Sequence, residues 1–184
     1  MTRAFIDANV IVQSWTLDVL LSLAEDDLFE PVWSARVMDE ARNAICRARG
    51  CPASMADAYV KTIEDAFPDA MAPQGVELEG RLVLPDPNDR HVAAAAIAGD
   101  CGVLVTHNIR DFPNDVLAPY GVIAMSPDEF VLMLACEDEE AVLDAARRVV
   151  TSKRHPPRTM EQEVAGLRRN GLVRFADLLD AESI

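Results

Sequence analysis

Short apolar segments that end in polar residues alternate with helical segments along this chain, and this alternation limits the folds open to it. Residues 3–8, 103–106 and 121–124 have the length and composition of buried strands, and residues 81–84 look like a further short strand. Strands that alternate with helices form a parallel sheet with helices on both faces. We therefore expect an α/β fold built on a short parallel sheet.

Helix start and stop signals occur between the expected strands. Ser34 is a favourable N-cap for one helix, and Gly50 is a favourable stop for it. Asp86 can cap a later helix because Pro87 suits the first helical position, and Ser126 can cap another. The helices expected from these signals and from apolar spacing cover residues 14–26, 34–49, 54–66, 86–99 and 126–135.

The chain has 184 residues, which is enough for one compact domain with a real core. We expect a main α/β domain over residues 1–135 and a C-terminal helical extension over residues 136–184. The extension has helical spacing but is too short to bury a core of its own. It is therefore expected to pack on the main domain or beside it.

The formal net charge of −14 bears on nucleic-acid binding. Sequence-independent wrapping of nucleic acid relies on a basic surface, which this composition disfavours. A nuclease is not excluded, because bound cations reverse the local field of a carboxylate cluster. Much of the negative charge also lies outside any candidate site, notably in residues 137–140.

Cysteines, histidines and apolar runs indicate which metal sites and which cellular location are compatible with this chain. The four cysteines form no Cys-x-x-Cys pair and only three histidines are present, so a zinc site is not expected. Reduced thiols fit a cytoplasmic protein. No apolar run approaches the roughly 20 residues that span a bilayer, and the N-terminus lacks the apolar core of a secretion signal. We expect a cytoplasmic protein without membrane contact.

Polar and acidic side chains gather where the expected strands end. In open parallel sheets, ligands bind beyond the carboxyl ends of the strands. Asp89 falls in the first turn of the helix that leads to the strand at residues 103–106. The candidate residues that end an expected strand or follow it closely are Asp7, Asn9, Thr106, Asn108 and Asp111.

Glu40 joins this set from the interior of a helix. It shares a helical face with Val37 and Ala44, so its carboxylate is expected to turn toward the apolar side, where it needs a partner or a metal ion. Several carboxylates gathered together are costly without a cation, and Mg²⁺ prefers oxygen ligands. Water bound to such an ion can attack a phosphodiester. The sequence offers no convincing Ser, Cys or His triad as an alternative.

Four segments in a fixed order resemble the acidic motifs of PIN domains: FIDANV, VMDEARNAI, DPNDRHVAAAA and VTHNIRDFP. The resemblance covers most of the expected main domain and is strongest in the last two segments. It implies a three-layer α/β/α fold and endoribonuclease activity that depends on Mg²⁺ or Mn²⁺. VapC toxins are small members of this family, and for them the resemblance also implies inhibition by a cognate antitoxin.

The resemblance implies metal-binding and catalytic roles for four acids, which are Asp7, Glu40, Asp89 and Asp111. Three neighbours are expected to support them: Asn9, Thr106 and Asn108. The fourth acid departs from the family pattern, because many members carry Asp at the position of Asn108 and Asp111 stands in for it. This departure leaves a second metal site open.

Simpler interpretations of the same residues stand beside these. Asp7 and Asp111 are of a type common in turns, and Asp89 is favourable in a first helical turn. Asp86 is expected to cap its helix rather than to bind metal. His91 follows Asp89 by two positions and is expected to pack or to face solvent.

Two other functions remain open at this point. A phosphatase of the haloacid-dehalogenase kind also begins with Asp after a first strand, but it expects a second Asp where this chain has Asn9. A degenerate or non-toxin PIN module for RNA binding or processing is the other alternative.

Basic residues are scarce in this chain. Those expected to bind RNA are Arg42, Lys153 and Arg154. The antitoxin is the alternative partner of the C-terminal extension. A homodimer is compatible with the chain.

Overall fold

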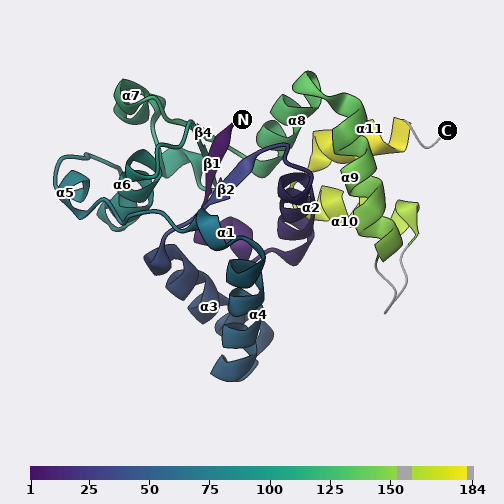
Figure 1. Cartoon of the computed structure of the whole chain (residues 1–184), viewed down its shortest axis with the longest axis horizontal. Coiled ribbons are helices and arrows are strands. Elements are labelled where there is room, and N and C mark those ends of the chain that lie inside the picture. The colour runs from purple at the N-terminus through teal and green to yellow at the C-terminus, as the bar shows by residue number, and fades with distance from the viewer. Residues whose placement is uncertain (153–158, 182–184) are drawn as a thin grey trace.

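The computed structural model describes residues 1–152 and 159–181, and within them four parallel strands form one sheet (Figure 1). The strands lie in the order β2-β1-β3-β4 and are β1 (Arg3–Ile6), β2 (Glu30–Val32), β3 (Val103–Val105) and β4 (Ile123–Met125). Phe5 pairs with Leu104 across the two central strands, and both side chains are fully buried. The prediction of an α/β fold with a short parallel sheet is confirmed.

The sheet differs from the sequence prediction at one strand. Residues 81–84 form no strand, although Leu82 and Leu84 are buried and Val83 is 76% exposed. Their alternation reflects a loop packed on the core, without a neighbouring strand to complete a ladder. The sequence did not predict β2, which contains Pro31. Proline is tolerated there because β2 lies at the edge of the sheet.

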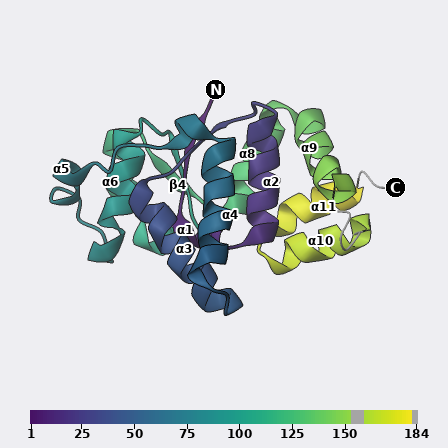
Figure 2. The ribbon, with the colours of Figure 1, turned by 60° about the horizontal axis from the view of Figure 1, so that its bottom comes forward.

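Helices cover both faces of the sheet. They are α1 (Ala8–Ile11), α2 (Ser14–Glu25), α3 (Ala35–Arg49), α4 (Ala53–Ala66), α5 (Val76–Glu79), α6 (Arg90–Ala98), α7 (Asn114–Leu117), α8 (Pro127–Glu137), α9 (Glu139–Ser152), α10 (Met160–Arg169) and α11 (Val173–Ala181). Figures 1 and 2 show α5 and α6 on one side of the strands and α2, α8 and α9 on the other. Right-handed connections between parallel strands produce such layers. The three-layer α/β/α prediction is confirmed.

Helix boundaries follow the local signals in the sequence. The Ser34 side chain accepts a hydrogen bond from the amide of Val37 at 3.3 Å, which starts α3. Gly50 ends the same helix in the left-handed region, at φ 58° and ψ 29°, where glycine pays no steric penalty. Ser126 and Glu129 form a reciprocal capping box at the start of α8. These predicted boundaries are confirmed.

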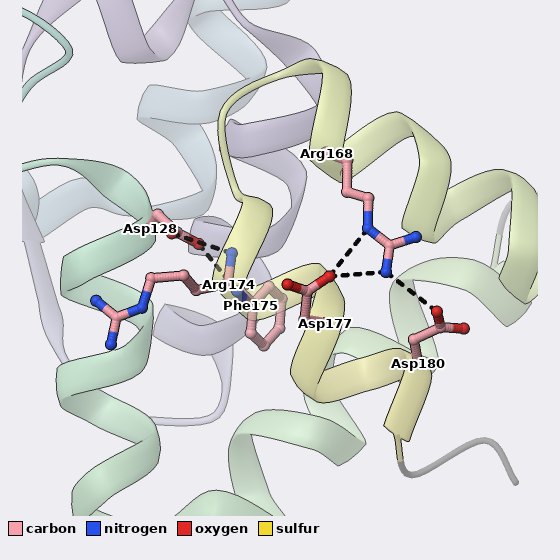
Figure 3. Close-up of polar contacts among 6 residues, drawn as sticks. All are labelled: Asp128, Arg168, Arg174, Phe175, Asp177 and Asp180. Atoms are coloured by element: carbon pink, nitrogen blue, oxygen red, sulfur yellow. Dashed lines mark hydrogen bonds and ion pairs between the residues drawn. The ribbon is translucent and has the colours of Figure 1, made fainter.

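The C-terminal helices pack against α2 and α8. A β-carbon on Gly166 of α10 would lie 2.1 Å from Cζ3 of Trp15, so the bare glycine backbone rests on the Trp15 ring. The buried carboxylate of Asp128 in α8 accepts hydrogen bonds from the amides of Arg174 and Phe175 at the start of α11 (Figure 3). The domain boundary after residue 135 falls within α8 and stays a prediction.

Candidate functional site

Asp7 lies where β1 ends, and it is fixed to the neighbouring strand. Its amide donates to the carbonyl of Val105 at 3.0 Å. Its Oδ2 accepts hydrogen bonds from Thr106 Oγ1 at 2.6 Å and from Asn9 Nδ2 at 2.7 Å. The residue is 7% exposed. Burial raises the pKa of this carboxyl, and the hydrogen bonds from Thr106 and Asn9 partly offset that effect.

Asn9 and Thr106 tie together the ends of β1 and β3. The Asn9 amide group donates to Thr106 Oγ1 at 3.0 Å, and its Oδ1 accepts from the backbone amide of His107 at 3.1 Å. Thr106 Oγ1 in turn accepts from the amide of Asn108 at 3.0 Å. The Asn108 side chain donates to the carboxylate of Asp111. Polar contacts therefore join every residue that the sequence placed after these two strands.

Asp89 ends the short 3-10 helix Pro87–Asp89 that precedes α6. Its Oδ2 is buried, and among the described residues no group donates a hydrogen bond to it. Burial, together with smaller contributions from nearby negative charges, raises the pKa of this carboxyl to about 6. In decreasing order of effect, those charges belong to Asp7, Asp86, Asp111 and Glu40.

Asp86 itself has the capping role that the sequence predicts. Its carboxylate accepts a hydrogen bond from the amide of Asn88 at 2.8 Å, and Pro87 occupies the first position of the turn. The cap accounts for this aspartate without a ligand. Its charge adds to the raised pKa of Asp89, but less than burial and the charge of Asp7 do.

Glu40 lies at the flank of the buried stripe of α3, and its side chain is 43% exposed. The predicted inward orientation is therefore only partial. Glu40 Oε1 lies 3.0 Å from His91 Nε2 and 3.5 Å from Arg36 Nε. Burial raises the pKa of Glu40, and the charge of Arg36 opposes this. The charges of the other three predicted acids all act on Asp89. Glu40 is held at the side of this group by its contacts with His91 and Arg36.

His91 and Arg36 are the site residues that the sequence reasoning missed. His91 packs, as one of the two expectations for it allowed, but it also binds Glu40. The available signal was a single histidine within the alanine-rich run of α6, where a buried polar group needs a partner. Arg36 gave no comparable signal, because an arginine one turn before a glutamate is an ordinary surface pair.

The donor set suits a hard divalent cation. Within residues 1–152 and 159–181, no group of three or more His, Cys, Asp and Glu side chains is already gathered around one point. Uncompensated negative charge is nevertheless present, since Asp89 has a buried oxygen without a donor and a raised pKa. Carboxylate oxygens are the ligands that Mg²⁺ and Mn²⁺ accept. The residues therefore fit such an ion.

The basic residues expected to bind RNA are placed less favourably. The guanidinium of Arg42 forms ion pairs with Asp39 and Asp57, which neutralise its charge. Lys153 and Arg154 lie outside the described residues. The structure thus gives no support to Arg42 as an RNA contact and leaves the other two as predictions.

A cavity of about 650 Å³ lies at the amino-terminal ends of β1 and β2, whereas the acids lie at the carboxyl ends of the strands. Arg3 and Glu30, which begin β1 and β2, are among its lining residues and form an ion pair at 2.7 Å. None of the four predicted acids lines this cavity. The acids lie beyond the other ends of the strands, where ligands of open α/β sheets bind.

Comparison with known proteins matches two parts of the chain. The PIN domain family model matches residues 3–110, and the VapC50 C-terminal domain model matches residues 127–181. The chain is 41% identical over 71 residues to a protein named "Putative ribonuclease VapC50" from Mycobacterium tuberculosis (strain ATCC 25618 / H37Rv). That alignment covers 39% of this chain and 42% of the relative, so the chain spans less than half of the relative's length. No solved structure matches the chain.

Proposed function

Since the chain belongs to the PIN-domain family, we propose that it is a divalent-metal-dependent endoribonuclease and the toxin of a type II toxin–antitoxin pair. The observation that carries the proposal is the buried Oδ2 of Asp89, which receives no hydrogen bond from any described residue. It lies within the field of Asp7, Glu40 and Asp111, which raise its pKa further. A VapC-like assignment is supported by the relative's name and by the match of residues 127–181.

The four acids would hold Mg²⁺ or Mn²⁺, namely Asp7, Glu40, Asp89 and Asp111. When bound, the ion supplies a water of lowered pKa and a positive charge for the phosphate and the leaving oxygen. The protein's own groups prepare the acids for this role. Thr106 and Asn9 donate to Asp7 Oδ2 and fix its orientation, and Asn108 does the same for Asp111. His91 fixes Glu40 from the α6 side.

The proposal is tested by RNA cleavage with Mg²⁺ or Mn²⁺ and with EDTA. We expect the wild type to cleave only with the ion, and Asp7→Asn to lose cleavage by at least about 100-fold while keeping its fold. Asp86→Asn is the matched control, because asparagine caps a helix nearly as well as aspartate. It is expected to retain most activity. Full activity of a folded Asp7→Asn protein would refute the site.

Partners follow from the same proposal. RNA is the substrate, and a small antitoxin protein is the expected inhibitor, whereas a homodimer stays a prediction. Among the helices of residues 1–152 and 159–181, none has both the length and the apolar character needed to cross a bilayer. A cytoplasmic location also stays a prediction.

Family membership sets aside the phosphatase of the haloacid-dehalogenase kind. Asn9, which that alternative required to be Asp, instead bonds to Asp7 and Thr106. A non-catalytic PIN module would bind RNA without cleaving it, with or without divalent ions. The cleavage assay separates that module from the nuclease.

A further inference from the structure

The turn between α10 and α11 borders the candidate site through a chain of contacts. Asn9 Oδ1 accepts a hydrogen bond from the backbone amide of His107, directly beside the Asp7 carboxylate. A β-carbon at Gly171 in the turn would lie 3.9 Å from Cε1 of the His107 ring. Gly171 has a φ of +89°, which a side chain would strain. The C-terminal helices therefore reach the edge of the sheet that carries the acids.

Asp128 fixes the start of α11 at this edge. Its Oδ1 accepts from the amide of Phe175 at 3.0 Å, and its Oδ2 accepts from the amide of Arg174 at 3.2 Å. Asp128 belongs to the first turn of α8, which begins two residues after β4 ends. The backbone of Arg174 is thus anchored beyond the end of β4, on the same side of the sheet as Asp7.

The two arginines in Figure 3 differ in how their charges are used. Arg168 lies between two carboxylates, with Asp177 Oδ1 at 2.7 Å and Asp180 Oδ2 at 3.1 Å. Arg174 is exposed and leaves α11 on the side of α8, away from both carboxylates. Hydrogen bonds from Ser126 lower the pKa of Glu129, and the nearby charge of Arg174 adds to this. That carboxylate accepts hydrogen bonds from Ser126, and within the described residues it accepts none from the Arg174 side chain.

Arg110 presents a second cation of this kind, three residues after His107 in the chain. It lies in the short 3-10 helix Ile109–Asp111, next to the predicted ligand Asp111, and it is exposed. Within residues 1–152 and 159–181, neither Arg110 nor Arg174 forms an ion pair with a carboxylate, whereas Arg36, Arg42 and Arg168 all do. In a chain of net charge −14, two such arginines at one end of the sheet are available to bind an anionic partner.

We propose that Arg110 and Arg174 bind backbone phosphates of single-stranded RNA beside the acids, so that α11 forms part of the substrate-binding surface. The inference rests on the proposed function, since it names how that substrate is held. Arginine presents several donors in a planar fork that matches phosphate oxygens. The acids and a bound ion act only at the scissile phosphate, and flanking phosphates require separate cations.

The test measures binding of a short, fluorescently labelled single-stranded RNA to the full chain in EDTA, by anisotropy across a series of salt concentrations. Each phosphate contact contributes about 0.7 to the slope of log affinity against log salt for single strands. The double variant Arg110→Gln, Arg174→Gln is therefore expected to flatten the slope by about 1.4 and to weaken binding at low salt by at least about 10-fold.

The control is the double variant Arg3→Gln, Arg168→Gln, which removes the same net charge from two arginines that pair with carboxylates of the protein. It is expected to keep the wild-type slope. A wild-type slope in the Arg110, Arg174 variant overturns the inference, as does equal loss in the control. If RNA binds through these arginines but is never cleaved with Mg²⁺ or Mn²⁺, the nuclease proposal alone fails. If cleavage occurs and the slope is unchanged, this inference alone fails.

Discussion

His91 holds the carboxylate of Glu40 through one ring nitrogen, with Nε2 lying 3.0 Å from Oε1. The histidine is 4% exposed, and burial, with the charge of Arg36, lowers its pKa to about 4. The imidazole is therefore neutral near pH 7, and Nε2 must carry the proton in order to donate to the carboxylate. Its Nδ1 is then an acceptor, buried and without a donor among the described residues.

This contact predicts that His91 positions a metal ligand. His91→Ala is expected to weaken Mn²⁺ binding by about 10-fold or more, because loss of a residue that hydrogen-bonds to a metal ligand and orients it typically has an effect of this size. Glutamine retains a donor, so His91→Gln is expected to restore part of the affinity. Mn²⁺ affinity is measured by titration calorimetry on protein without RNA. Equal affinity of the His91→Ala and wild-type proteins, both folded, would show that Glu40 needs no such support.

The pKa of Asp89 predicts how stability depends on pH in the absence of divalent ions. Because the folded pKa is raised from 3.8 to about 6, the folded state binds the proton more tightly than the unfolded chain. The stability contributed by the protonated group is present below 3.8 and is lost as pH rises through about 6. The melting temperature in EDTA is expected to fall across this window because of Asp89.

Asp89→Asn removes the titrating group and is expected to flatten that fall, with a higher melting temperature than the wild type above pH 6. Asp115→Asn, on the exposed first turn of α7, is the control and should leave the profile unchanged. Parallel profiles for wild type and Asp89→Asn would mean that the acids do not interact as their placement indicates.

Divalent ions are predicted to stabilise the folded chain through the four acids. At 100 times the dissociation constant, a ligand that binds only the folded state contributes about 2.7 kcal/mol. Mg²⁺ or Mn²⁺ should therefore raise the melting temperature of the wild type, and much less that of the Asp7→Asn, Glu40→Gln variant. The control Glu77→Gln, Asp115→Asn carries the same charge change on exposed helices. Identical shifts in all three proteins would place the ions elsewhere.

Gly166→Ala is predicted to destabilise the protein, although alanine is usually better than glycine in a helix by about 1 kcal/mol. The added carbon would lie 2.1–2.4 Å from atoms of the Trp15 ring, so α10 must move away from α2. Overpacking of this kind costs about 1–3 kcal/mol. Thermal unfolding measures the loss, and Gly102→Ala is the control because nothing lies within 4 Å of its added carbon.

A second variant separates the clash from other effects at the same position. If the Trp15 ring is the cause, Trp15→Ala should make the further change Gly166→Ala nearly neutral or stabilising, so the two losses should not add. Additive losses would place the effect outside the Trp15–Gly166 contact.

Local physics let the sequence determine a large part of the fold. Ser34 and Gly50 set the ends of α3 through hydrogen bonding and backbone conformation within a few residues. Asp7 and Thr106 were expected beyond strand ends because polar residues follow buried apolar runs, and parallel strands bring such ends together. Each of these inferences depends on near neighbours in the chain or on the common direction of the strands.

Tertiary structure alone decided which segments became neighbours. Pro31 belongs to a strand because β1 offers an open edge, whereas residues 81–84 have strand-like alternation and no strand to pair with. His91 meets Glu40 only because α6 packs beside α3, across 51 positions of sequence. Local propensity cannot predict such partners, because the free energy of a buried hydrogen bond or of a strand pair depends on the residues of the other segment.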